Sequence, residues 1–254
     1  MCHLYSDLMD TYGDKGNITT LTKRCEWRGI ETKVTSISIG NPLSDYDIFF
    51  FGGGQDRQQI IVGEDLQKKA KDLKKSVESG AVLLSICGGY QLLQNYFKTL
   101  DGVEIKGIGL FDACTQGSTS RMIGNLLVEI NPALQKEIKD VYKSTVYRLP
   151  TSDLVGFENH SGKTNLGSNL QPLGTVIKGA GNNGEDGTEG AVYKNAFGCY
   201  LHGSLLPKNP HFADFLIAKA LERKYGKSTS WRKLKSLDDS IEWQAHKQAN
   251  SRTQ

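Results

Sequence analysis

An apolar run that ends in a cysteine and two glycines occupies residues 81–93: Ala81-Val82-Leu83-Leu84-Ser85-Ile86-Cys87-Gly88-Gly89-Tyr90-Gln91-Leu92-Leu93. The pattern predicts a buried strand, a sharp turn at Cys87 and a following helix. Small residues two positions before and after a nucleophile, here Ser85 and Gly89, relieve crowding on such a turn, and the first helical amides can face a developing oxyanion. The alternative is a buried core cysteine beside an ordinary turn. The segment alone leaves both interpretations open.

Strands and helices alternate through the first hundred residues. The expected strands are His3–Leu8, Glu31–Ser38, Tyr46–Phe51 and Ala81–Ile86, and the expected helices are Ile18–Arg28, Gly63–Gly80 and Gly89–Lys98. The Tyr46–Phe51 segment is almost entirely apolar, as is typical of a strand buried on both faces. This alternation predicts an α/β fold, a right-handed, doubly wound, mainly parallel sheet flanked by helices.

The second half of the chain is richer in short β-like segments separated by Gly and Asn clusters. The expected strands are Gly107–Phe111, Asn125–Ile130, Leu154–Glu158, Thr175–Lys178, Gly190–Tyr193 and Ala196–Tyr200, and the expected helices are Ala133–Tyr142 and His211–Tyr225. We expect one domain over residues 1–228, followed by a polar tail over residues 229–254. The tail carries Trp231 and Trp243, which favours docking on the core or on a partner, although a frayed terminus is equally compatible.

Composition narrows the class of protein. The formal net charge of the 254 residues is +3, and the basic residues near position 70 alternate with acidic and apolar ones, so nucleic-acid binding is not expected. Five scattered cysteines without CxxC spacing make disulfides and a zinc site improbable, and no metal site is expected. No export signal or membrane-length apolar run is apparent. These features predict a cytoplasmic protein without a transmembrane segment.

A cysteine nucleophile needs a base and an oxyanion hole. His202 ends the apolar run Phe197–Leu201 and is followed by Gly203, which suits a base on a rigid strand end. His160, at a strand-to-loop junction, is a weaker candidate for the base. The candidate oxyanion donors are the amide of Gly88 and an amide of Gly53 or Gly54, which follow the preceding strand.

Three segments together resemble class I (triad-type) glutamine amidotransferases, which have a flavodoxin-like fold: Phe51-Gly52-Gly53-Gly54-Gln55-Asp56, Cys87-Gly88-Gly89-Tyr90-Gln91-Leu92-Leu93 and Tyr200-Leu201-His202-Gly203. The resemblance is to the branch of the cobyric acid and cobyrinic acid diamide synthases and covers about residues 1–225. Within that branch, the N-terminal segment is similar to the glutaminase subunits of lipid II isoglutaminyl synthases. This segment reads Leu8-Met9-Asp10-Thr11-Tyr12-Gly13-Asp14-Lys15-Gly16-Asn17-Ile18.

The resemblance implies a role for each matching residue. Cys87 would attack the side-chain amide of L-glutamine, and His202 would be its base. Gln91 would lie beside the substrate, and Arg121 would hold the glutamine, since a guanidinium grips a carboxylate bidentately. The ammonia would go to a Mur-ligase-like, ATP-dependent partner in a heterodimer, which amidates the D-glutamate α-carboxylate of lipid II to D-isoglutamine.

Two features point to dependence on a partner. Many class I relatives carry a Glu two residues after the catalytic His, where this chain has Ser204; the cobyric acid branch commonly lacks this Glu as well. Our hypothesis is that the partner supplies the orienting carboxylate, with Glu158 or another residue of this chain as alternatives. Gly162-Lys163-Thr164 lacks the upstream glycine of a P-loop, so we expect no cofactor in this chain and ATP and Mg²⁺ on the partner.

Three other functions remain open from the sequence. The chain could be the glutaminase subunit of another, cobyrinic-acid-type amidotransferase, or a stand-alone γ-glutamyl hydrolase. It could also be a non-catalytic scaffold that uses its glycine-rich loops for binding. The joint presence of Cys87, Gln91 and His202 weakens the scaffold interpretation.

Overall fold

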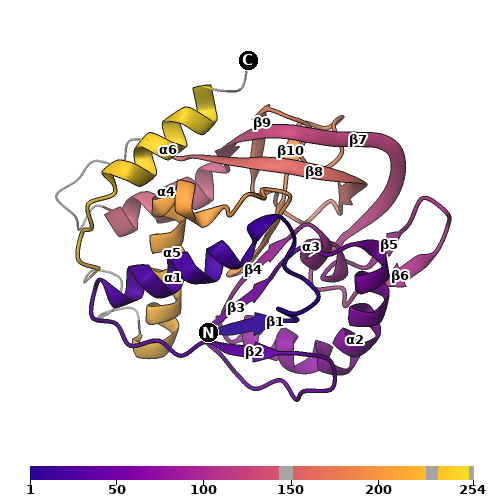
Figure 1. The fold of residues 1–254 in the computed structure, drawn as a ribbon, viewed down its shortest axis with the longest axis horizontal. Coiled ribbons are helices and arrows are strands. Elements are labelled where there is room, and N and C mark those ends of the chain that lie inside the picture. Colours follow the sequence, from indigo (N-terminus) through magenta and orange to yellow (C-terminus); the bar gives the residue numbers. More distant parts are fainter. Residues whose placement is uncertain (143–150, 227–233, 252–254) are drawn as a thin grey trace.

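The computed structural model describes residues 1–142, 151–226 and 234–251 (Figure 1). Its elements, in chain order, are β1 (Cys2–Leu4), η1 (Thr11–Gly13), α1 (Lys15–Glu26), β2 (Thr35–Ile37), β3 (Ile48–Phe51), α2 (Asp56–Glu78), β4 (Val82–Ile86), α3 (Gly88–Leu92), β5 (Tyr96–Lys98), β6 (Glu104–Lys106), β7 (Ala113–Ile130), α4 (Pro132–Tyr142), β8 (Asp153–Leu166), β9 (Gly174–Lys178), β10 (Thr188–Glu189), β11 (Ala191–Tyr193), β12 (Ala196–Cys199), η2 (Leu206–Lys208), α5 (Pro210–Tyr225) and α6 (Ser240–Ser251).

The first sheet has the strand order β11-β12-β4-β3-β1-β2. Five of its strands, β12, β4, β3, β1 and β2, run parallel, and β11 closes one edge in the antiparallel direction. The α/β class and the mainly parallel, doubly wound sheet predicted from the sequence are therefore confirmed. Because parallel strands end at a common edge, the loops after β1, β3, β4 and β12 meet there.

Helices cover both faces of this sheet, as the continuous apolar character of β3 requires. Ile48 and Phe50 pack into a core with residues of α1 and α5, whereas Phe49 and Phe51 pack with residues of α2. All four side chains are buried. Full burial of one such side chain contributes about 1.5–3 kcal/mol to the stability of the fold. The helices on the two faces therefore hold the sheet, and the loops at its edge, in a fixed position.

The second half forms a mixed sheet of order β10-β9-β7-β5-β6, with β8 also paired to β7. The long β7 and β8 strands form a curved ribbon over the first sheet (Figure 1). Two sequence predictions are wrong here. The helix expected over Gly89–Lys98 ends at Leu92, because residues 96–98 pair with both β6 and β7. The strand expected over Gly107–Phe111 is a loop that donates hydrogen bonds to the carbonyls of Leu92 and Leu93.

The last element of the described residues is helix α6, which contacts η2, β8 and β7. Half-buried Trp243 stacks on His211 of α5, with ring centroids 5.2 Å apart. Trp231 and the expected boundary at residues 228 and 229 lie outside the described residues. No helix in the described ranges combines the length and apolar character needed to cross a membrane.

Candidate active site

Cys87 lies between β4 and α3 in a conformation that non-glycine residues rarely adopt, with φ 48° and ψ −108°. Such a backbone is held only when its surroundings over-determine it, and such strain is concentrated at active sites. The Cys87 amide donates to the Cys199 carbonyl at 2.8 Å. A Cβ at Gly89 would lie 2.5 Å from the Phe51 carbonyl oxygen, so only glycine allows α3 to approach the loop after β3. Cys87 therefore has the geometry of a nucleophile elbow rather than of a core cysteine.

His202 follows β12 and is fully buried beside this elbow. Its backbone N–H and C=O pair with Phe157 of β8 at 2.8 and 3.2 Å. Its Nδ1 lies 3.1 Å from Oδ1 of Asp14, which is also fully buried. A carboxylate at this position fixes the ring orientation and the Nδ1–H tautomer. The Nε2 atom has no hydrogen-bond partner within the described residues, and it is the atom left for the thiol.

The electrostatic setting of His202 favours its charged form. Burial by itself lowers the pKa of His202, but the negative charge of Cys87, together with the hydrogen bond and the charge of Asp14, outweighs burial and raises the pKa to about 10. The protonated form of His202 is therefore favoured at neutral pH. Cys87, His202 and Asp14 thus have the arrangement expected of a nucleophile, its proton acceptor and an orienting carboxylate.

The sequence hypothesis placed the orienting carboxylate on a partner, with Glu158 or another residue of this chain as alternatives. Among the described residues of this chain, Asp14 is the carboxylate that lies against Nδ1 of His202, which favours the alternative of a residue of this chain. Glu158 is engaged elsewhere, because its carboxylate accepts the backbone N–H groups of Ala180 and Gly181 at 2.7 and 2.9 Å. Ser204 does not replace the missing Glu, and its hydroxyl donates to the Gly13 carbonyl. That bond ties the loop of His202 to the loop that carries Asp14.

The glycine triplet after β3 contributes unequally to the expected oxyanion hole. The Gly53 amide already donates to Oδ2 of Asp14 at 2.8 Å, so the expectation that it binds an oxyanion is wrong for this geometry. Gly54 packs against Gly88 so closely that a Cβ at Gly88 would lie 2.9 Å from the Gly54 nitrogen. Gly54 and Gly88 are therefore neighbours, and their amides remain the candidate oxyanion donors.

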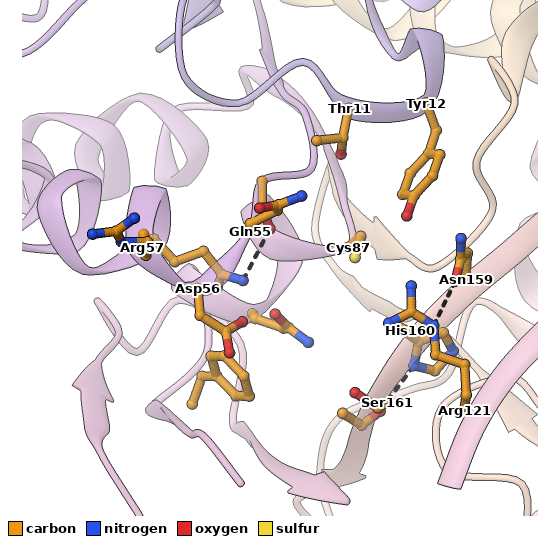
Figure 2. A pocket seen from close by; sticks show the side chains of 15 residues that line it. Thr11, Tyr12, Gln55, Asp56, Arg57, Cys87, Arg121, Asn159, His160 and Ser161 are labelled. Carbon is orange, nitrogen blue, oxygen red and sulfur yellow. Dashed lines mark hydrogen bonds between the residues drawn. The ribbon is translucent and has the colours of Figure 1, made fainter. Parts of the chain in front are cut away.

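The elbow opens into a cavity of about 520 Å³ (Figure 2). Its lining residues come from the loops after β1, β3 and β4, from the starts of α2 and α3, and from β5, β7 and β8: Thr11, Tyr12, Gly54, Gln55, Asp56, Arg57, Gln59, Cys87, Gln91, Phe97, Arg121, Asn159, His160, Ser161 and Gly162. Buried Gln91 donates through Nε2 to the Tyr200 hydroxyl at 3.1 Å. Exposed Arg121 donates from Nε to Asn159 at 2.7 Å, and among the described residues its terminal nitrogens have no hydrogen-bond partner, so they could bind a ligand.

His160 also lines the cavity, but its contacts indicate a supporting role. Its ring stacks on Tyr200 with centroids 3.6 Å apart, and its Nδ1 bonds with the Gly162 carbonyl at 2.9 Å. Across the described ranges, no group of three or more His, Cys, Asp or Glu side chains is arranged to hold a metal ion. The Cys87 sulfur at the elbow borders this cavity, and this geometry suits acyl transfer through a cysteine nucleophile.

The structure places Cys87, Gln91, Arg121 and Gly54 on the lining of one cavity, and His202 beside Gly53 in the adjoining glycine loop. It adds Asp14, which the sequence analysis did not single out. Asp14 and His202 are 188 positions apart, and only the shared edge of the parallel strands brings them together. The available signal was the position of Asp14 in the polar loop after the first strand, since such loops meet at that edge.

Comparison with known proteins agrees with this geometry. The family model for the CobB/CobQ-like glutamine amidotransferase domain matches residues 1–210. The chain is 39% identical over 89% of its length to the GatD subunit of the glutamine-hydrolysing lipid II isoglutaminyl synthase of Streptococcus pneumoniae R6, and covers 82% of that protein. It is 40% identical over 87% of its length to the same subunit of Staphylococcus aureus N315, and covers 84% of it.

A solved glutamine amidotransferase from Thermotoga maritima shares the fold. The TM-score is 0.53 at 15% sequence identity, and the alignment covers 98% of this chain and 92% of that one.

Proposed function

Because the chain belongs to the CobB/CobQ-like glutamine amidotransferase family, we propose that it is the glutamine-hydrolysing subunit of a lipid II isoglutaminyl synthase. It releases ammonia from L-glutamine at Cys87. A second subunit uses the ammonia to amidate the D-glutamate α-carboxylate of lipid II. The observation that carries the proposal is the strained Cys87 elbow, coupled to His202 and Asp14 at the end of one cavity.

Arg121 and Gln91 position the substrate in this mechanism. The terminal guanidinium nitrogens of Arg121 hold the α-carboxylate of glutamine at the β7–β8 wall of the cavity. Gln91 on α3, fixed by its bond to Tyr200, borders the side-chain amide next to the sulfur. Because both ends of the glutamine substrate are held, its amide carbon lies next to the thiolate. This placement lowers the entropic part of the activation barrier.

The first half-reaction forms a γ-glutamyl thioester. The Cys87 sulfur attacks the side-chain carbonyl carbon, and the amides of Gly88 and Gly54 bind the developing oxyanion. His202 then gives its proton from Nε2 to the amide nitrogen, the C–N bond breaks and ammonia leaves. Throughout this step, Asp14 stabilises the imidazolium and holds its tautomer.

The second half-reaction returns the enzyme to its starting state. His202 Nε2 takes a proton from water, whose oxygen attacks the thioester carbonyl. The C–S bond breaks, glutamate is released and the Cys87 thiolate is regenerated beside the protonated His202. One water is consumed, and one glutamate and one ammonia are produced for each glutamine.

Amidation of a carboxylate needs an activated acid, and the sequence carries no nucleotide-binding motif. We therefore assign ATP and Mg²⁺ to a Mur-ligase-like partner subunit that forms a heterodimer with this chain. This assignment accords with the relatives, which are named as subunits of a glutamine-hydrolysing synthase. A nucleotide-activated acceptor would be amidated in the cytoplasm, which is the location we propose for the complex.

Reconstitution with that partner tests the proposal. Wild-type complex should amidate lipid II with either glutamine or ammonium chloride as nitrogen source. A complex with Cys87→Ala should retain ammonium-dependent amidation and lose glutamine-dependent amidation. Equal use of glutamine by both complexes would refute the proposed nucleophile. Glutamine hydrolysis without amidation of lipid II would favour a different acceptor or a stand-alone hydrolase.

A further inference from the structure

The two residues that follow His202 have an unusual backbone. Gly203 has φ 71° and Ser204 has φ 46°, so two consecutive residues are in the left-handed region. A serine in that region is disfavoured and persists only when neighbouring contacts hold it. The loop after His202 therefore needs an external support to keep the ring aligned with Cys87.

Lys208 of η2 provides contacts suited to this support. Its ammonium group donates to the carbonyl oxygens of both Gly203 and Ser204, the latter at 3.3 Å. Burial lowers the pKa of Lys208, and no carboxylate lies within 4 Å of its ammonium nitrogen among the described residues. The side chain thus directs a desolvated charge to two backbone carbonyls next to the base, rather than to an ion pair.

Helix α6 in turn holds Lys208. Buried His246 donates from Nδ1 to the Lys208 carbonyl at 2.8 Å, and α6 contacts η2 directly. Just before α6, Asp239 accepts two hydrogen bonds from buried Arg24 of α1, at 2.6 and 3.0 Å. The C-terminal helix, which lies beyond the residues matched by the family model, is therefore anchored to the core through two separate contacts.

We propose that Lys208 is a positioning residue for His202, and that α6 holds it in place through His246. The inference rests on the proposed function, since it assigns a part in glutamine hydrolysis to residues outside the cavity. Lys208 fixes the carbonyls of Gly203 and Ser204, and thereby the angle at which Nε2 of His202 meets the sulfur.

Glutaminase kinetics of Lys208→Met in the full chain, with its synthetase partner, test the proposal. Loss of the two hydrogen bonds from Lys208 should lower kcat about 10–100-fold, because small misplacements of catalytic groups reduce reaction rates by about that factor. KM should stay within about 3-fold of the wild-type value. Lys208→Arg can reach both carbonyls and should recover most of kcat. The matched control is Lys219→Met on α5, whose ion pair with Glu137 is remote from the loop, and it should hydrolyse glutamine like wild type.

A second readout separates positioning from general structural damage. The rate at which iodoacetamide alkylates Cys87, followed by peptide mass spectrometry across pH, reports the sulfur–imidazole pair without substrate. Lys208→Met should slow alkylation near neutral pH, whereas Lys219→Met should not. If Lys208→Met does not fold, His246→Asn, which keeps a donor, and His246→Phe, which does not, provide the same comparison.

The experiments distinguish a failure of the positioning role from a failure of the proposed function. Wild-type kinetics and wild-type alkylation for Lys208→Met, or for His246→Phe in its place, would overturn the positioning role while leaving glutamine hydrolysis intact. A wild-type complex that does not hydrolyse glutamine would instead refute the proposed function.

Discussion

Replacing Asp14 with asparagine should nearly abolish glutamine hydrolysis while preserving the fold. The introduced side chain can still accept the Gly53 amide through its oxygen, which turns its NH₂ group toward Nδ1 of His202. The imidazole would then carry its proton on Nε2, the wrong tautomer for taking a proton from the thiol or from water. The buried charge that stabilises the imidazolium is lost at the same time.

The separation of the two groups sets the size of the effect. Unit charges 3.1 Å apart interact by about 5 kcal/mol at an effective dielectric constant of about 20. Each 1.36 kcal/mol corresponds to a factor of ten in rate, and part of the interaction is offset by desolvation. We therefore expect kcat for glutamine hydrolysis to fall about 10³-fold, with KM changed by less than about 3-fold.

The assay is steady-state glutamate release by the reconstituted complex, with ammonium-dependent amidation as the internal standard. Asp10→Asn is the matched control, because Asp10 lies in the same loop and caps the Lys15 amide at 2.6 Å without contacting His202. A rate for Asp14→Asn within 10-fold of wild type would refute the assignment. That result would return the orienting role to a carboxylate of the partner, as the sequence first suggested.

Three further changes probe the site. Arg121→Met should raise KM for glutamine about 10–100-fold in steady-state assays and change kcat little, since a hydrogen bond to a charged group contributes about 1.5–3 kcal/mol; an unchanged KM would exclude Arg121 as the carboxylate ligand. Gly89→Ala should lower the free energy of unfolding by about 1–3 kcal/mol in urea titrations, because its Cβ meets the backbone oxygens of Phe51 and Gly52 at 2.5 and 2.8 Å. Wild-type stability would show that the contact relaxes. The pKa of His202 is about 10 in the folded chain and about 6.5 when unfolded, so its charge stabilises the fold fully below pH 6.5 and progressively less as pH rises to 10. The stability difference between wild type and His202→Gln should shrink over that range, and a difference that grows would contradict the raised pKa.

Local patterns in the sequence were sufficient to predict the elbow at Cys87 and the parallel sheet. A strand that ends in Cys87 and two glycines carries its own signal, because strand, turn and helix are contiguous. The fully apolar β3 likewise indicates a strand covered on both faces. These inferences needed no knowledge of which distant segments meet.

The incorrect predictions share a physical cause. Asp14 meets His202 only through the convergence of loops at the sheet edge, and no local pattern encodes a contact between segments so far apart. The segment after Leu92 has helix-compatible residues, but pairing of Tyr96 and Lys98 with β6 and β7 outweighs that weak propensity. Gly53 has the sequence position of an oxyanion donor, but its amide is occupied by a carboxylate from a distant loop.

The central claim is that Cys87 cleaves glutamine with help from His202 and Asp14. Its most direct test is the rate of glutamate release by Cys87→Ala in the reconstituted complex. The mechanism predicts that hydrolysis falls to the uncatalysed background while the complex still amidates with ammonium. Glutamine hydrolysis by Cys87→Ala at the wild-type rate would contradict it.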